Sequence, residues 1–204
     1  MEKINWADYK GAANPVTEAY REIRTNLQNT NAKLIAFTSL TATTEQSKIV
    51  AGLAISLAQN GKHVLLADGN FAFPSHHILF DLPNEGLTDA VAAGKDLNGV
   101  IQHCLEQENL DIMVGGTSSL VGNQVFSDSV IQFFLSDVQA RYDYIFMDMP
   151  PIDSGSDAIV VSPKVDGMVL VITRGVDRIN ALIDANEKLT KVGAHVLSCI
   201  LDKV

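Results

Sequence analysis

The sequence predicts an α/β fold whose doubly wound, mostly parallel sheet is flanked by helices. Two observations lead to this class: short apolar segments alternate with amphipathic helical segments along the chain, and several short segments are apolar at every position. Residues 168–172 read Met-Val-Leu-Val-Ile, as expected of a parallel strand covered by helices on both faces. Since the composition does not change along the 204 residues, we expect a single domain, 1–204.

Local periodicity places the individual elements. A helix is expected over residues 15–28, because Pro15 suits a first helical turn and apolar residues then recur at helical spacing. These are Val16, Tyr20, Ile23 and Leu27. Strands are expected at 34–38, 63–67, 110–114, 144–147, 168–173 and 196–201. Helices are expected between them at 47–60, 127–141, 157–162 and 178–192.

Composition and charge limit the classes of function. Apolar residues make up 47% of the chain, which indicates a globular protein, and no apolar run reaches the roughly 18 to 20 residues of a membrane span. The net charge of −9 argues against nucleic acid as a partner, because phosphate binding depends on clustered lysine and arginine. Residues 1–11 lack the features of a signal peptide, so the cytoplasm is the expected compartment.

Several conspicuous side chains are expected to be structural. Cys104 and Cys199 lie in separate elements without metal-type spacing, and we expect both to be buried, small apolar side chains. His76 and His77 are adjacent, and adjacent residues point apart on a helix or a strand, so a solvated loop pair is expected rather than a metal site. The two tyrosines at 142 and 144 are expected to pack in the core.

Polar segments follow three of the expected strands, at the edge where open α/β sheets bind their ligands. They are residues 38–47, 68–70 and 148–151. Together with Glu-Ala-Tyr-Arg-Glu-Ile-Arg-Thr-Asn-Leu at 18–27, they resemble the cytoplasmic domain of the bacterial tyrosine kinases that accompany capsule and exopolysaccharide export. The resemblance runs from about residue 15 to 204, and it implies a P-loop NTPase-like fold of the partition and cell-division ATPase type.

The family's phosphate-binding loop is glycine-rich and ends in Gly-Lys-Ser-Thr, so that backbone N–H groups and a lysine can hold phosphates. The corresponding loop here is Thr43, Thr44, Glu45, Gln46, Ser47 and Lys48. Both glycines and the lysine are replaced, and Glu45 places a carboxylate where a β-phosphate would lie. We expect the loop to cap the following helix instead, with Thr44 or Glu45 near its first N–H groups. A shifted register would make Lys48 the motif lysine.

The family's acidic motifs are only partly present. The Asp-x-Asp motif and its following basic pair read Asp-Gly-Asn-Phe-Ala-Phe here, so Asp68 remains, Asn70 replaces the second aspartate, and Ala72 and Phe73 replace the basic pair. Asp148 matches the Walker B aspartate, although its simpler role is to cap the turn after a strand. Asp68 and Asp148 are therefore interpreted as remnants of a catalytic site.

The resemblance implies a tyrosine-kinase-like domain that has kept the fold but not the nucleotide chemistry. The expected role is regulation or scaffolding in capsular or exopolysaccharide biosynthesis and export, without a cofactor. Expected partners are a second copy or an active kinase paralogue, and a membrane chain-length or export protein at the inner face of the plasma membrane. Two alternatives stay open. One is an active ATP-dependent protein-tyrosine kinase that uses ATP and Mg²⁺ with Asp68, Asp148 and Lys48, and the other is a relative of the partition-type ATPases.

The helix at 15–28 carries the family's Glu-x-x-Arg-x-x-Arg pattern as Glu18, Arg21 and Arg24. In the family this helix joins neighbouring subunits of a ring. We expect its apolar stripe to dock on its own domain while the three charged side chains project elsewhere. A solvated charged face is the alternative. Because arginine pairs bidentately with carboxylates, we expect these residues to mediate head-to-tail association with a second copy or a paralogue.

Overall fold

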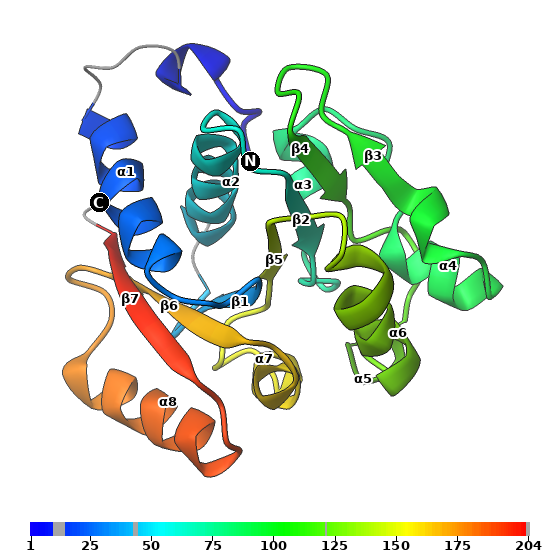
Figure 1. The fold of residues 1–204 in the computed structure, drawn as a ribbon. Coiled ribbons are helices and arrows are strands. Elements are labelled where there is room, and N and C mark those ends of the chain that lie inside the picture. The colour runs from blue at the N-terminus through cyan, green and yellow to red at the C-terminus, as the bar shows by residue number, and fades with distance from the viewer. Residues whose placement is uncertain (10–14, 43–44, 121, 203–204) are drawn as a thin grey trace.

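The computed structural model describes residues 1–9, 15–42, 45–120 and 122–202 of the chain. Its seven strands form one sheet in the order β3-β4-β2-β5-β1-β6-β7 (Figure 1). The strands are β1 (Leu34–Ser39), β2 (Val64–Asp68), β3 (Ile101–His103), β4 (Leu110–Met113), β5 (Tyr144–Asp148), β6 (Gly167–Thr173) and β7 (Val196–Asp202). All neighbouring strands pair in parallel except β3 and β4. The predicted fold class is confirmed.

Helices cover both faces of the sheet, as Figure 1 shows for α1 and α2 on one side and α7 and α8 on the other. The α-helices are α1 (Pro15–Gln28), α2 (Glu45–Ala58), α3 (His76–Leu79), α4 (Leu87–Ala93), α5 (Gly122–Val125), α6 (Asp128–Phe133), α7 (Asp157–Val161) and α8 (Ile179–Lys191). Shorter turns are η1 (Trp6–Tyr9), η2 (Leu97–Val100), η3 (Phe134–Val138) and η4 (Ser162–Lys164).

The alternation of side chains along the central strand β1 explains the two cores. Ile35 and Phe37 point toward α1 and α2, where they join one buried cluster, and Leu34 and Ala36 join the cluster beneath α6, α7 and α8. Each strand face is therefore buried, which is why the central strands are apolar at nearly every position. Tyr142 and Tyr144 are both buried, as expected.

Three local expectations differ from the structure. The helix expected over 127–141 ends as an α-helix at Phe133 and continues as the π-helical turn η3. The antiparallel strand β3 was not predicted, because its three residues are too few to show a period. Cys104 is buried as expected, but Cys199 is exposed, because it lies on the edge strand β7.

Helix α1 docks on α2 through its apolar stripe. Tyr20 is 9% exposed and Leu27 is 1% exposed, and Ile23 packs against the same cluster. The Tyr20 ring lies directly over Gly52 of α2, where a Cβ atom would be only 2.3 Å from the ring. A glycine at this position therefore lets the two helices approach each other. The side chain of Val16, the fourth member of the predicted stripe, lies outside the described residues.

Candidate functional site

The site is built where β1, β2 and β5 end. Asp68 closes β2 and Asp148 closes β5, and the two residues are direct partners in the parallel register. Both are fully buried. Helix α2 begins after β1, the other neighbour of β5, so its first turn faces the same two carboxylates. The strand-end argument thus placed both aspartates at one edge of the sheet, and the structure brings them together.

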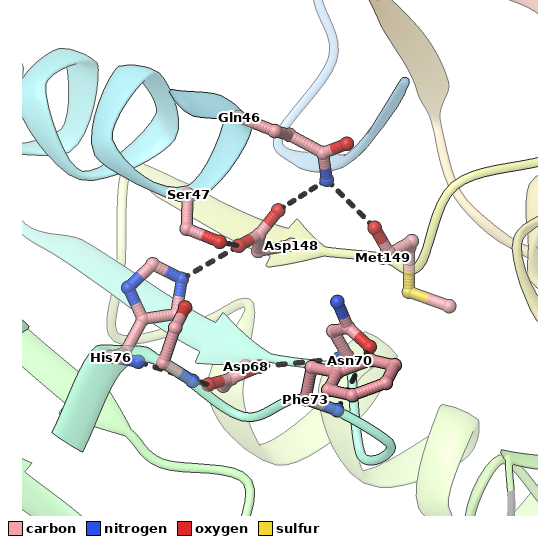
Figure 2. Close-up of polar contacts among 9 residues, drawn as sticks. Gln46, Ser47, Asp68, Asn70, Phe73, His76, Asp148 and Met149 are labelled. Atoms are coloured by element: carbon pink, nitrogen blue, oxygen red, sulfur yellow. Dashed lines mark hydrogen bonds and ion pairs between the residues drawn. The ribbon is translucent and has the colours of Figure 1, made fainter. Parts of the chain in front are cut away.

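Three side chains donate hydrogen bonds to Asp148, as Figure 2 shows. The Gln46 Nε2 group lies 2.6 Å from Oδ1, the Ser47 hydroxyl 2.5 Å from Oδ2, and His76 Nε2 3.0 Å from Oδ2. Gln46 Nε2 also donates to the carbonyl of Met149 at 2.7 Å. The amide of Gln46, the second residue of α2, is therefore turned inward onto Asp148.

Asp68 organises the loop that follows β2. Its Oδ1 accepts from the backbone N–H of Asn70 at 3.1 Å, and its Oδ2 accepts from the backbone N–H groups of Ser75 at 2.7 Å and His76 at 3.1 Å. These bonds close residues 69–75 into a turn that delivers His76 to the interior. Asp68 therefore has a structural role in this chain.

His76 is fully buried, so the expectation of a solvated histidine pair is wrong for this residue. It is the first residue of α3 and forms an ion pair with Asp148, 72 residues further along the chain. Its neighbour His77 is partly exposed. Sequence alone gave no sign of the difference, because the two adjacent histidines are distinguished only by the direction in which α3 leaves the Asp68 turn.

The electrostatics of this cluster favour protonation of the His76 imidazole. Burial lowers the pKa of His76, but the hydrogen bond with Asp148 and the negative charges of Asp68 and Asp148 outweigh it, so the pKa is raised. Burial raises the pKa of Asp68, and the charge of His76 opposes that change. The raised pKa favours the protonated form of His76, whose ring bonds to Asp148 through Nε2 while its Nδ1 is buried without a hydrogen bond.

The remainder of the expected phosphate loop lies apart from this cluster. Helix α2 starts at Glu45, two residues earlier than expected, and Glu45 pairs with Lys48 at 3.1 Å. Lys48 lines a separate depression beside Asn5 and Leu79. Thr43 and Thr44 lie outside the described residues, so the expected capping contact of Thr44 is not tested.

The predicted interface residues are only partly free of their own domain. Glu18 and Arg21 are exposed and pair with each other on α1. Arg24 is half-buried and donates to the carbonyl and hydroxyl oxygens of Ser56 on α2, both at 3.3 Å. The expectation that Arg24 projects away from the domain is therefore wrong, because its long side chain reaches the neighbouring helix.

Comparison with known proteins identifies the family. CapB of Staphylococcus aureus, which is assigned as a tyrosine-protein kinase, is 30% identical over 194 residues that cover 93% of this chain and 85% of CapB. The chain belongs to the bacterial tyrosine-kinase family of capsule and exopolysaccharide systems. Tyrosine-protein kinase YwqD of Bacillus subtilis is 29% identical over 91% of this chain and 80% of its own length. No protein-family model matches the chain.

Solved structures of this tyrosine-kinase family have the same fold. The kinase domain of the Escherichia coli tyrosine kinase ETK superimposes with a TM-score of 0.86 at 25% identity, covering 100% of this chain and 88% of that chain. The septum site-determining protein MinD of Pyrococcus horikoshii, complexed with Mg-ADP, has a TM-score of 0.68 at 22% identity, covering 83% of this chain and 69% of that chain. The MinD likeness concerns the fold alone. Among the described residues, no helix is both long and apolar enough to span a membrane.

Proposed function

We propose that this chain is a catalytically degenerate member of the tyrosine-kinase family, which acts as a regulatory or scaffolding component of capsular or exopolysaccharide biosynthesis and export. The observation that carries the proposal is that the buried carboxylate of Asp148 accepts hydrogen bonds from Gln46, Ser47 and His76. Under this proposal, the hydrogen bonds to Asp148 take the place of contacts with nucleotide and Mg²⁺. They stabilise the fold and do not support phosphoryl transfer.

The residues present do not fit a magnesium nucleotide. Asp68 and Asp148 each accept three hydrogen bonds from their own chain, and a carboxylate has only about four lone-pair positions. Gln46 is neutral, and Glu45 adds negative charge at the start of α2, where phosphate binding needs positive charge.

The test is a calorimetric titration with ATP and ADP, with and without Mg²⁺. We expect no binding tighter than about millimolar, which corresponds to roughly −4 kcal/mol. A matched variant carries Thr43→Gly, Glu45→Gly and Gln46→Lys, which restore the family's loop residues. We expect it to bind ATP at least tenfold more tightly than the parent chain. A micromolar dissociation constant for the parent chain would sink the proposal and leave an active kinase as the alternative.

No specific observation favours either alternative function. An active kinase with Lys48 as its phosphate-binding residue would need that ammonium free to meet phosphates, whereas Lys48 pairs with Glu45. A partition-type ATPase would share the fold seen in MinD, and that likeness does not extend to function.

The proposed partners follow from the charged face of α1. We propose that three residues of α1, Glu18, Arg21 and Arg24, contact a second copy or an active kinase paralogue. The side chain of Arg24 also bonds to Ser56 of α2. A membrane polysaccharide chain-length or export protein is the proposed second partner, at the cytoplasmic side of the membrane. Its support is membership of the tyrosine-kinase family of capsule and exopolysaccharide systems.

Reversing the charge of Arg21 tests the self-association. The Arg21 side chain is exposed and, among the described contacts, bonds only to Glu18. Arg21→Glu is therefore expected to lower the associated mass seen by light scattering, with a change in stability of no more than about 0.5 kcal/mol. Arg178→Glu, an equal charge change at the exposed start of α8, is the control and should leave the mass unchanged. An unaltered mass for Arg21→Glu would refute the interface.

A further inference from the structure

A polar pocket of about 240 Å³ lies between α1 and α2, two helices that Figure 1 shows next to each other. Arg21 and Arg24 of α1 line one side of it. Ser56, Gln59 and Asn60, at the end of α2 and just after it, line the other side. The described lining shares no residue with the cluster around Asp148, so this pocket is separate from the carboxyl ends of the strands.

The described lining of the pocket is positively charged. Its two ionised side chains are Arg21 and Arg24, and the other lining side chains are neutral hydroxyl and amide groups. The one carboxylate bonded to these arginines in the described contacts is that of Glu18, which pairs with Arg21. An anion in this recess would therefore meet two guanidinium groups, although the whole chain has a net charge of −9.

The guanidinium group of Arg24 is half-buried, and the described contacts give it no negative partner. It donates only through Nη1, to the carbonyl and hydroxyl oxygens of Ser56, both at 3.3 Å. Both acceptors are neutral, and both distances are long for a charged donor. Charged groups that are withdrawn from water are normally paired with an opposite charge. The Nε and Nη2 groups of Arg24, which have no acceptor in the described contacts, are therefore the donors that an anion would meet.

The donors of the two arginines suit a phosphate group better than a carboxylate. Arg21 also bonds through Nη1 alone in the described contacts, to Glu18. Each guanidinium group has five N–H donors in a planar fork. Two forks can serve the three terminal oxygens of a phosphate, whereas a carboxylate has two oxygens in one plane. The Ser56 carbonyl, which would repel an anion, already accepts from Arg24 and from Asn60 Nδ2.

We infer that the pocket between α1 and α2 binds a phosphate group, with Arg24 as its main charge partner and Arg21 as the second. The pocket lies within one protomer, so binding does not require self-association. The same two arginines are proposed above to contact a second copy, and a bound phosphate would neutralise them. Phosphate is therefore expected to weaken that contact, and this consequence alone rests on the proposed function.

Inorganic phosphate, methyl phosphate and acetate are the probes that test the inference. Each is titrated into the full 204-residue chain at pH 8, where both phosphates are mainly dianionic, with the ionic strength held constant by sodium chloride. Binding is followed by the guanidinium ¹³C resonances of an arginine-labelled sample. Both phosphates are expected to shift the resonances of Arg21 and Arg24 and to bind at least fivefold more tightly than acetate. The ratio of the two phosphates tells whether free phosphate or a phosphate monoester fits better.

Two variants locate the binding. Arg24→Gln is expected to weaken phosphate binding at least fivefold, whereas Arg178→Gln, the same change at the exposed start of α8, should leave it unchanged. Asn60→Asp keeps both arginines and adds a carboxylate to the lining, so it is also expected to weaken phosphate binding at least fivefold. Its control is Asn186→Asp, at an exposed position of α8.

Three results would overturn the inference: no saturable shift up to about 20 mM phosphate, equal binding of phosphate and acetate, or unchanged binding in both Arg24→Gln and Asn60→Asp. Light scattering of the same samples reports separately on self-association. A mass lowered by Arg21→Glu in a chain that does not bind phosphate would contradict the pocket alone. Phosphate binding in a chain whose mass Arg21→Glu does not change would contradict the interface alone.

Discussion

Replacing Asp148 by asparagine is expected to lower the free energy of unfolding by about 3 kcal/mol. The carboxylate accepts hydrogen bonds from three donors in a fully buried position, and an asparagine amide offers one oxygen and an NH₂ group that opposes the remaining donors. If Asp148 instead served to bind Mg²⁺ and nucleotide, its carboxylate would lack hydrogen-bond donors in the unliganded protein. Asp148→Asn would then remove an unsatisfied charge and change the free energy of unfolding little. The direction of the effect therefore distinguishes a structural aspartate from a catalytic one.

The pH dependence provides a second measure of the same substitution. A raised pKa of His76 contributes stability that is fully present below its ordinary value of about 6.5 and is lost as the pH rises through the folded value. Asp148→Asn removes the hydrogen bond and one of the charges that raise this pKa. Urea unfolding at pH 6 and pH 8.5 should therefore show a larger difference between parent and variant at pH 6.

Asp153→Asn is the matched control for this measurement, because Asp153 lies on the same segment but is exposed. It is expected to change the stability by no more than about 0.5 kcal/mol at either pH. An Asp148→Asn variant that is as stable as the parent chain would contradict the structural role of the buried cluster.

Replacing Gly52 by alanine is expected to destabilise the protein by about 2 kcal/mol, although alanine favours helices. The new Cβ atom would lie 2.3 Å from the Cζ and Oη atoms of Tyr20, so the ring must leave its position over α2. Tyr20 and Leu27 are the buried side chains of α1 among the described residues, so displacement of Tyr20 would loosen the helix. Loss of association in the same variant is expected, because α1 presents Glu18 and Arg21.

A double-mutant cycle separates this clash from a general effect of the substitution. In a Tyr20→Leu background the ring is absent, so Gly52→Ala should be neutral or should stabilise by up to about 1 kcal/mol through helix propensity. The measurement is the free energy of urea unfolding for all four proteins. A destabilisation of equal size in both backgrounds would show that Tyr20 is not the cause.

The strand and helix pattern was largely predictable because it depends on neighbours in sequence. Strand β6 is apolar at consecutive positions and α1 repeats its apolar residues every three or four, and both were found close to the expected positions. Short elements without a full period, such as β3 and η3, were missed or misassigned. The strand ends also placed Asp68 and Asp148 at one edge, since the carboxyl ends of parallel strands meet there.

By itself the sequence determined the fold class and the family, because the strand and helix pattern and the family's motifs are written in consecutive residues. Only the tertiary structure decided which side chains surround Asp148. Gln46 meets Asp148 across 102 positions of the chain, and His76 meets it across 72. Arg24 likewise bonds to Ser56 on another helix. A polar side chain is buried only where distant groups satisfy its hydrogen bonds, and the packing of separate strands and helices decides which groups those are.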